Sequence, residues 1–155
     1  MAFDLAFGAR PGVKRVDYLG IPFFAVTHHP VSRRREFTIS SAGFWAQHAT
    51  SEWLLTTRPN IRRARAPFAK GLLAFNVLAS VAYGGAALTR TGPAERDTRG
   101  LAASFGPRGM DERWAGVLVL APAALDAYRY FSPDAKWAAW ASRAVKVGMV
   151  LMVMR

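Results

Sequence analysis

The chain has 155 residues, enough for one domain and too few for two domains of ordinary size. Hydrophobic residues make up 52% of it and charged residues 20%, with a formal net charge of +11. It contains no cysteine, which excludes disulfide scaffolds, thiolate metal sites and thiol catalysis. The charges cluster between apolar runs, and this pattern is typical of integral membrane proteins.

The start of the chain holds no stretch long enough to cross a bilayer. Residues 1–16 are broken by glycine and proline and are expected to form a surface segment, and they do not have the pattern of a signal peptide. Residues 17–29 contain about nine apolar residues interrupted by Pro22, too few to span. We expect them either to lie at the headgroup level or to pack on the protein as a loop or strand.

Residues 37–57 have the length of a membrane span but an unsuitable composition. They include His48 and Glu52, and an ionised group at the centre of a membrane helix costs about 3 kcal/mol. At helical spacing, Ser41, His48 and Glu52 share one stripe. The segment therefore predicts an amphipathic helix that lies in the membrane interface or is half inserted, with a fourth membrane span as the alternative.

Two clusters of arginine flank this segment. They are expected to contact anionic lipid headgroups. For the second cluster, the alternative is that it is the ordinary positive flank of a membrane helix. The arginines concerned are Arg33, Arg34, Arg35, Arg58, Arg62, Arg63 and Arg65.

The uncharged run 71–89 is the clearest membrane-span signal. Its nineteen residues lie between two basic residues and would form roughly 28 Å of helix, close to the thickness of the hydrocarbon core. Ser80 and Gly84 form a pair of small residues four apart, and Asn76 is the only strongly polar side chain. We expect Asn76, Ser80 and Gly84 to form a face for packing against another helix.

Residues 114–131 and 136–154 are predicted to be the second and third spans. Pro122 is expected to kink the first of them, and a Ser-Pro-Asp turn would join the two as an antiparallel hairpin. In such a hairpin, Arg143 would lie about one turn from Asp126, within reach of its long side chain. An isolated charge at this depth is costly, so we predict an intramembrane pair, either structural or part of an ion or proton pathway.

Charge asymmetry predicts the orientation of the chain. Residues 1–70 carry 11 Lys and Arg against four Asp and Glu, whereas residues 90–113 carry five against four. By the positive-inside rule, the N-terminal half would be cytoplasmic and residues 90–113 would lie on the other side. The expected organisation is thus a basic N-terminal region at 1–69 and a membrane region at 70–155. The abundance of Ala, Arg and Gly suggests a bacterial inner membrane protein.

His28, His29 and His48, together with Glu52, are the candidate ligands for a cofactor. His48 and Glu52 are four residues apart and would share a helix face, and two axial histidines could hold a haem or a pigment. The alternative is that all three histidines are ordinary hydrogen-bonded side chains. The sequence leaves the cofactor open, with none as the leading expectation.

The sequence contains no GxSxG, HExxH, phosphate-loop or nucleotide-binding motif, so no catalytic residue is predicted. We expect an all-α integral membrane protein with three spans that works as a non-catalytic accessory, structural or assembly subunit. The expected partners are other membrane subunits or a second copy, and anionic lipids, with no nucleic acid. The alternatives are a haem-, metal- or pigment-binding redox protein using the histidines and Glu52, and a small oligomeric transporter or channel using Asp126 and Arg143.

Overall fold

The computed structural model describes residues 2–18 and 20–154. The two predicted regions, 1–69 and 70–155, therefore lie within the described residues except at positions 1, 19 and 155. Within the described residues, six helices and one two-stranded sheet follow one another along the chain. In chain order the elements are α1 (Ala2–Ala6), β1 (Gly12–Tyr18), β2 (Ile21–Thr27), α2 (Arg33–Thr57), α3 (Pro67–Thr89), α4 (Asp97–Ser104), α5 (Glu112–Phe131) and α6 (Lys136–Met154).

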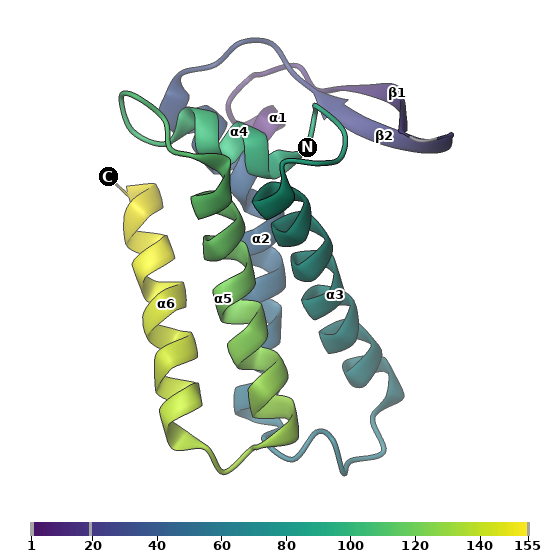
Figure 1. Ribbon diagram of the computed structural model, residues 1–155, viewed down its shortest axis with the longest axis vertical. Coiled ribbons are helices and arrows are strands. Elements are labelled where there is room, and N and C mark those ends of the chain that lie inside the picture. The colour runs from purple at the N-terminus through teal and green to yellow at the C-terminus, as the bar shows by residue number, and fades with distance from the viewer. Residues whose placement is uncertain (1, 19, 155) are drawn as a thin grey trace.

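Four long helices, α2, α3, α5 and α6, run side by side along the long axis of the molecule (Figure 1). α2 contacts the other three, and the most extensive helix contact joins α3 to α5. α1, the two strands and α4 lie together at one end, which we call the cap end (Figure 1). The connections at 58–66 and 132–135 form the opposite end, which we call the loop end.

Apolar packing is concentrated towards the two ends of the bundle. Near the loop end, Leu55 on α2 and Leu73 on α3 pack in one buried cluster with Ile61. At the cap end, Phe37 on α2 packs in a second cluster with Leu101 on α4. Polar side chains are also buried between the helices, and the candidate site lies beside the loop-end cluster.

Local sequence explains where α3 and α5 begin and end. Pro67 starts α3 because its ring is already set for a helical first turn, and Arg90 ends the helix in the left-handed conformation with φ of 56°. Asp111 caps α5 by accepting from the backbone N–H of Arg113 at 3.0 Å. That bond, and then the guanidinium of Arg90, hold the pKa of the Asp111 carboxyl below its ordinary value. Pro122 does not end α5, which continues to Phe131.

The two strands form an antiparallel hairpin at the cap end, with Val16 opposite Phe23. Gly20 lies in the turn with φ of 77°, a conformation that glycine adopts without strain. Of the two alternatives for residues 17–29, the structure therefore shows a strand. The sequence analysis did not predict the hairpin partner at 12–18.

The prediction of an all-α protein with three or four membrane spans is wrong. Among the described residues, only α3 is long and apolar enough to be a candidate span, by length and composition alone. α5 contains Asp126 and Arg129, and α6 contains Arg143 and Lys146; these ionised side chains lower the mean hydropathy of both helices. The sequence analysis judged the cost of each charge separately. Taken together, the charges make both helices too polar to be candidate spans.

The predicted horizontal helix at 37–57 is a helix of the bundle instead. α2 runs from the cap end to the loop end beside α3, α5 and α6 (Figure 1). Its polar stripe is turned inward: Ser41 is 4% exposed and His48 is 3% exposed. The stripe was recognised in the sequence, but it is turned into the bundle, where Glu52 bonds to α5 and α6.

Because α2 runs the length of the bundle, the two arginine clusters at 33–35 and 58–65 lie at opposite ends (Figure 1). The segment 90–111 lies at the same end as the hairpin, where Lys14 Nζ is 3.6 Å from Glu95 Oε1. The N-terminal half therefore cannot lie wholly on one side with 90–111 on the other, and the predicted orientation is not supported.

The closest helix contact joins α3 to α5 through two glycines. A Cβ added at Gly84 would lie 2.3 Å from Leu120 Cγ and 3.1 Å from the carbonyl oxygen of Gly116. Asn76 and Ser80 are also buried, at 5% and 0% exposure. The face predicted at Asn76, Ser80 and Gly84 is thus turned towards helices of the same chain.

Replacing Gly84 by alanine should destabilise the fold by about 1–3 kcal/mol, because the added methyl group overfills the contact with α5. The matched control is Gly85→Ala, where an added Cβ meets nothing within 4 Å. That change should stabilise the helix by about 0.5–1 kcal/mol, since alanine is the better helix former. Denaturant unfolding followed by circular dichroism measures both, and equal effects would contradict the packing.

Candidate functional site

The interior of the bundle beside the loop-end cluster holds ionised side chains from three helices. Asp126 and Arg129 are three residues apart on α5, and Arg143 and Lys146 are three apart on α6, so each pair shares one helix face. Glu52 supplies a further carboxylate from α2. Hydrogen bonds connect all five, and we call Glu52, Asp126, Arg129, Arg143 and Lys146 the ion network.

Glu52 is the centre of the ion network because its carboxylate accepts hydrogen bonds from all three cations. Arg129 binds it with both terminal nitrogens, Nη1 at 2.5 Å from Oε2 and Nη2 at 3.1 Å from Oε1. Arg143 Nε donates to Oε1 at 2.9 Å, and Lys146 Nζ donates to Oε2 at 2.9 Å. Two-pronged arginine–carboxylate contacts are among the strongest in proteins. Glu52 therefore ties α2 to both α5 and α6.

Asp126 is the second acidic centre and is 1% exposed. Lys146 Nζ lies 2.8 Å from each of its carboxylate oxygens. Ser142 Oγ donates to Oδ1 at 2.8 Å, and Arg129 Nη1 lies 3.4 Å from the same oxygen. Lys146 and Arg129 thus bridge Asp126 to Glu52, and the positive charge between the two carboxylates offsets their repulsion.

The structure brings Asp126 and Arg143, the predicted pair, into one network, but no hydrogen bond or ion pair joins them directly. Arg143 instead donates to Glu52 and, through Nη2, to Thr56 Oγ1 at 3.1 Å. Its side chain is 42% exposed. Lys146, one turn further along α6, makes the contact with Asp126. The hairpin geometry placed the right helix faces together, but the choice of partner depended on α2.

The ion network carries three cations and two carboxylates, a surplus of one positive charge. Asp126, Arg129 and Lys146 are only 1%, 5% and 8% exposed. Moving an ion from water into an apolar interior costs several kcal/mol, and mutual pairing with good geometry is what offsets that cost. Loss of one carboxylate would leave buried cations without a compensating negative charge. The burial of each charged side chain in the ion network therefore depends on the presence of the others.

A layer of uncharged polar residues joins α2 to α3 beside the ion network. Asn76 Nδ2 donates to the backbone oxygen of Gln47 and to Ser51 Oγ, each at 3.1 Å. His48 Nε2 and Ser80 Oγ are buried and have no hydrogen-bond partner among the described residues. An unsatisfied buried polar group costs about 1–3 kcal/mol. The cohesion of this layer therefore depends on the two bonds of Asn76.

The predicted cofactor ligands do not meet at one place. His28 lies at the cap end with Nε2 3.2 Å from Glu36 Oε2, and His29 is exposed beside it. His48 is inside the bundle, and the oxygens of Glu52 accept from the three cations. In the part of the chain that the structure describes, no group of three or more His, Cys, Asp or Glu could hold a metal ion.

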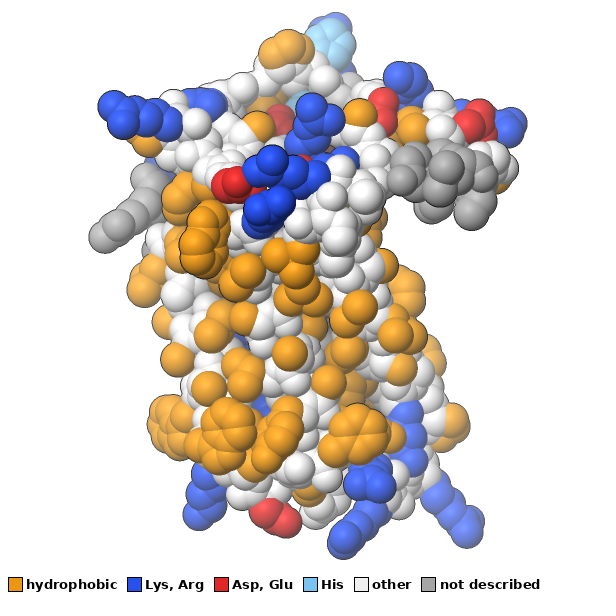
Figure 2. Space-filling model, viewed as in Figure 1, with side chains coloured by type: hydrophobic (Ala, Val, Ile, Leu, Met, Phe, Trp, Pro, Cys, Tyr) orange, Lys and Arg blue, Asp and Glu red, His pale blue; other side chains and the backbone are white. Residues whose placement is uncertain are grey.

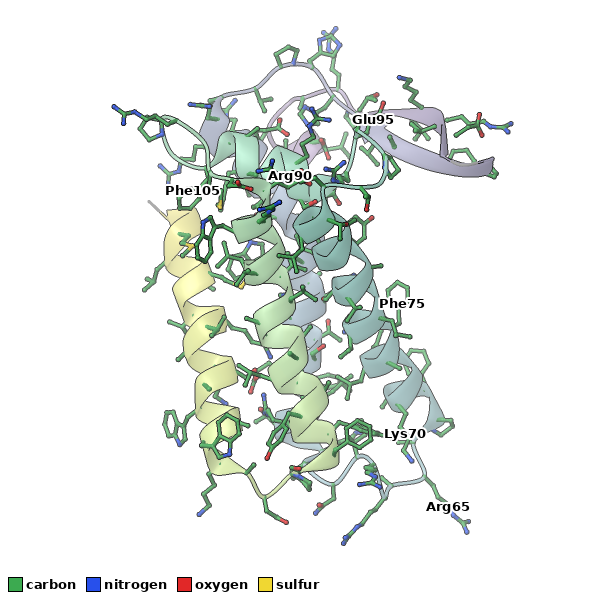
Figure 3. All side chains as sticks on the ribbon, viewed as in Figure 1. Arg65, Lys70, Phe75, Arg90, Glu95 and Phe105 are labelled. Carbon is green, nitrogen blue, oxygen red and sulfur yellow. The ribbon has the colours of Figure 1, made fainter. Side chains whose placement is uncertain are left out.

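The predicted lipid-contact arginines are exposed but divided between the two ends. Figure 3 shows Arg65 and Lys70 at the loop end and Arg90 with Glu95 at the cap end. At the cap end, Arg33 donates to the backbone oxygens of Ala103 and Pro107, so it fastens the segment after α4. Of the other predicted arginines, those at the cap end are Arg34 and Arg35, and those at the loop end are Arg58, Arg62 and Arg63.

Comparisons with known proteins assign no family to this chain. No family model matches it, and no curated protein and no solved structure matches it either.

The geometry of the ion network favours a structural task, because each carboxylate oxygen of Glu52 and Asp126 accepts at least one hydrogen bond.

Sequence analysis did not single out Arg129 or Lys146 as site residues. Arg129 lies among the aromatic residues Tyr128, Tyr130 and Phe131, a pattern typical of a membrane interface, and this pattern draws attention away from its charge. A signal was present: Asp126 and Arg129 have the spacing of an intrahelical pair, and Glu52 is an acid without a basic partner on its own face. Pairing the unpartnered acid of one predicted helix with the basic residues of another would have linked Glu52 to Arg129 and Lys146.

Replacing Glu52 by glutamine should destabilise the fold by about 3 kcal/mol or more, because three cations lose the carboxylate that compensates them. The matched control is Glu95→Gln, whose partner Lys14 is 3.6 Å away at the surface. That change should cost less than about 1 kcal/mol. Unfolding in denaturant gives both values, and an equal loss in the two variants would show that Glu52 is not the centre of the network.

Proposed function

We propose that this protein is a membrane-associated, non-catalytic accessory or assembly subunit that docks within a larger complex through the apolar sides of its bundle. The observation that carries the proposal is the outward direction of the apolar residues of α3. A core helix of a water-soluble bundle buries its apolar face. In the apolar window of α3, only 28% of the residues are buried.

Several of the largest apolar residues of α3 are exposed. Phe68 is 83% exposed, Phe75 is 63% exposed and Leu78 is 66% exposed. Figure 3 shows Phe75 pointing away from the bundle. The polar residues Asn76 and Ser80 point inward. This polarity suits a helix whose outer face meets hydrocarbon or another subunit, where small and polar residues hold the helices together.

Exposed apolar side chains continue over α5 and α6, and charged side chains gather at the two ends (Figure 2). The exposed members on these two helices are Trp114, Val117, Tyr128, Phe131, Trp137, Trp140, Val147, Val150, Leu151 and Met152. Several are aromatic and belong to the loop end, where Arg62 and Arg63 lie. Aromatic rings beside arginines suit the boundary between hydrocarbon and anionic headgroups, which supports the expected contact with anionic lipids.

The interior supports a subunit role rather than a catalytic one. In surroundings of low dielectric constant, the attractions within the ion network become stronger, and separating its members becomes more costly. Glu52, Arg129 and Lys146 would therefore lock three helices in register while the outer face of α3 remains available. An assembly element needs these two properties, a rigid body and an uncovered apolar side.

Leu78→Arg should remove the protein from the membrane fraction, or from the complex extracted from it, because a cation in hydrocarbon costs about 2.5–3.5 kcal/mol. The matched control is Thr57→Arg, which adds the same charge at an exposed position at the loop end. Fractionation, gentle detergent extraction and identification of co-purifying polypeptides measure the effect.

The wild-type chain and Thr57→Arg should both be recovered from membranes together with other polypeptides. Recovery of the wild-type chain as a monomer without detergent would overturn the proposal, as would equal behaviour of Leu78→Arg and Thr57→Arg.

A further inference from the structure

A small cavity opens between α2, α5 and α6 at the loop end, beside the ion network. Its volume is about 150 Å³, and it is lined by the guanidinium-bearing side chains of Arg129 and Arg143 together with Thr56. The remaining lining residues are Leu55, Pro59, Pro133 and Ala139. No carboxylate lines the cavity in the described part of the chain, so its polar wall is cationic and hydroxylic.

The cavity lies where the ion network has its surplus positive charge. Arg129 and Lys146 alone balance Glu52 and Asp126, so Arg143 is the third cation against two carboxylates. Arg143 is also the most exposed of the three. A guanidinium has five N–H donors. Arg143 uses Nε and Nη2 on Glu52 and Thr56, which leaves the Nη1 donors available for an anion.

We propose that this cavity binds the phosphate group of an anionic phospholipid, with Arg143 as the principal contact. The inference rests on the proposed membrane association and gives it a specific site. Arginine suits a phosphate because its planar donors match two phosphate oxygens at once. Thr56 Oγ1 lies in the same wall, but its hydrogen is donated to Glu52 Oε1 at 2.9 Å, so the donors for a phosphate come from Arg143.

The surface next to Arg143 fits a lipid better than a free anion. Trp140 and Val147 are its neighbours on α6, three residues before and four residues after it, and they are 70% and 56% exposed. Leu151, which is 59% exposed, continues this apolar stripe away from the loop end. An acyl chain could lie along the stripe while its phosphate reaches Arg143.

A second cavity provides room for the rest of the headgroup. Its volume is about 320 Å³, and it shares Pro133 with the first cavity. Arg62 and Arg63 line it, together with the carboxylate of Asp134. Hydroxyl groups of a glycerol headgroup could bond with these side chains, whereas the positive choline group would meet two arginines and only one carboxylate. The site therefore favours phosphatidylglycerol over phosphatidylcholine.

The experiment measures binding of three probes to the purified full chain in non-ionic detergent by native mass spectrometry. The probes are phosphatidylglycerol, phosphatidylcholine of the same chain length, and inorganic phosphate. We expect phosphatidylglycerol to bind about tenfold more tightly than phosphatidylcholine, whose choline group would meet Arg62 and Arg63, and than inorganic phosphate, which has no acyl chain for the apolar stripe. Inorganic phosphate that binds as tightly as phosphatidylglycerol, or equal binding of the two lipids, would overturn the assignment.

Arg143→Gln should weaken phosphatidylglycerol binding about tenfold. It should fold normally, because it leaves two cations facing two carboxylates. Arg143→Lys, which keeps the charge, should restore part of the affinity. Lys136→Gln removes the same charge from an exposed position on α6 outside both cavities and should bind like the wild type.

Unchanged lipid affinity in Arg143→Gln would overturn the site, as would an equal loss in Lys136→Gln, which would indicate only general surface charge. These outcomes are distinct from failure of the proposed function. A chain found in membranes with co-purifying polypeptides, but without an effect of Arg143, would retain the proposed function and lose the lipid site.

Discussion

Glu52 accepts hydrogen bonds from a lysine and two arginines on two other helices, and the arrangement of the bundle depends on this contact. Among the described residues, Asp126 is the other acid buried between the long helices. Three cations could not be brought there without both carboxylates, because uncompensated buried charge costs several kcal/mol. Inward-facing ions leave the apolar residues of α5 and α6 outside, and on α3 the inward-facing polar residues are the uncharged Asn76 and Ser80.

Helix positions were predictable because each depends on local sequence. The predicted segments 71–89, 114–131 and 136–154 correspond to Pro67–Thr89, Glu112–Phe131 and Lys136–Met154. Their packing was not predictable in the same way. The stripe on α2 indicated which face was polar, but the sequence does not say whether that face meets headgroups, water or another helix. The number of spans was overestimated because the cost of charges within α5 and α6 was judged residue by residue.

The candidate site was predictable in part. Asp126 and Arg143 were predicted as a pair because ions in apolar segments need partners, and Glu52 was predicted as a cofactor ligand; all three belong to the ion network. Their pairing could not be derived, since it depends on how far α2 reaches between α5 and α6. Arg129 was missed because neighbouring aromatic residues suggested an interface position. The histidines suggested a cofactor by residue type alone, and the fold separates His28 from His48.

A double-mutant cycle between Glu52 and Arg129 tests the central claim most directly. The cycle compares the unfolding free energies of Glu52→Gln, Arg129→Met and the double variant with that of the wild type. If Glu52 compensates Arg129, the double variant should be less destabilised than the sum of the single variants by about 2 kcal/mol or more. Additive effects, with a coupling energy within about 0.5 kcal/mol of zero, would contradict the account.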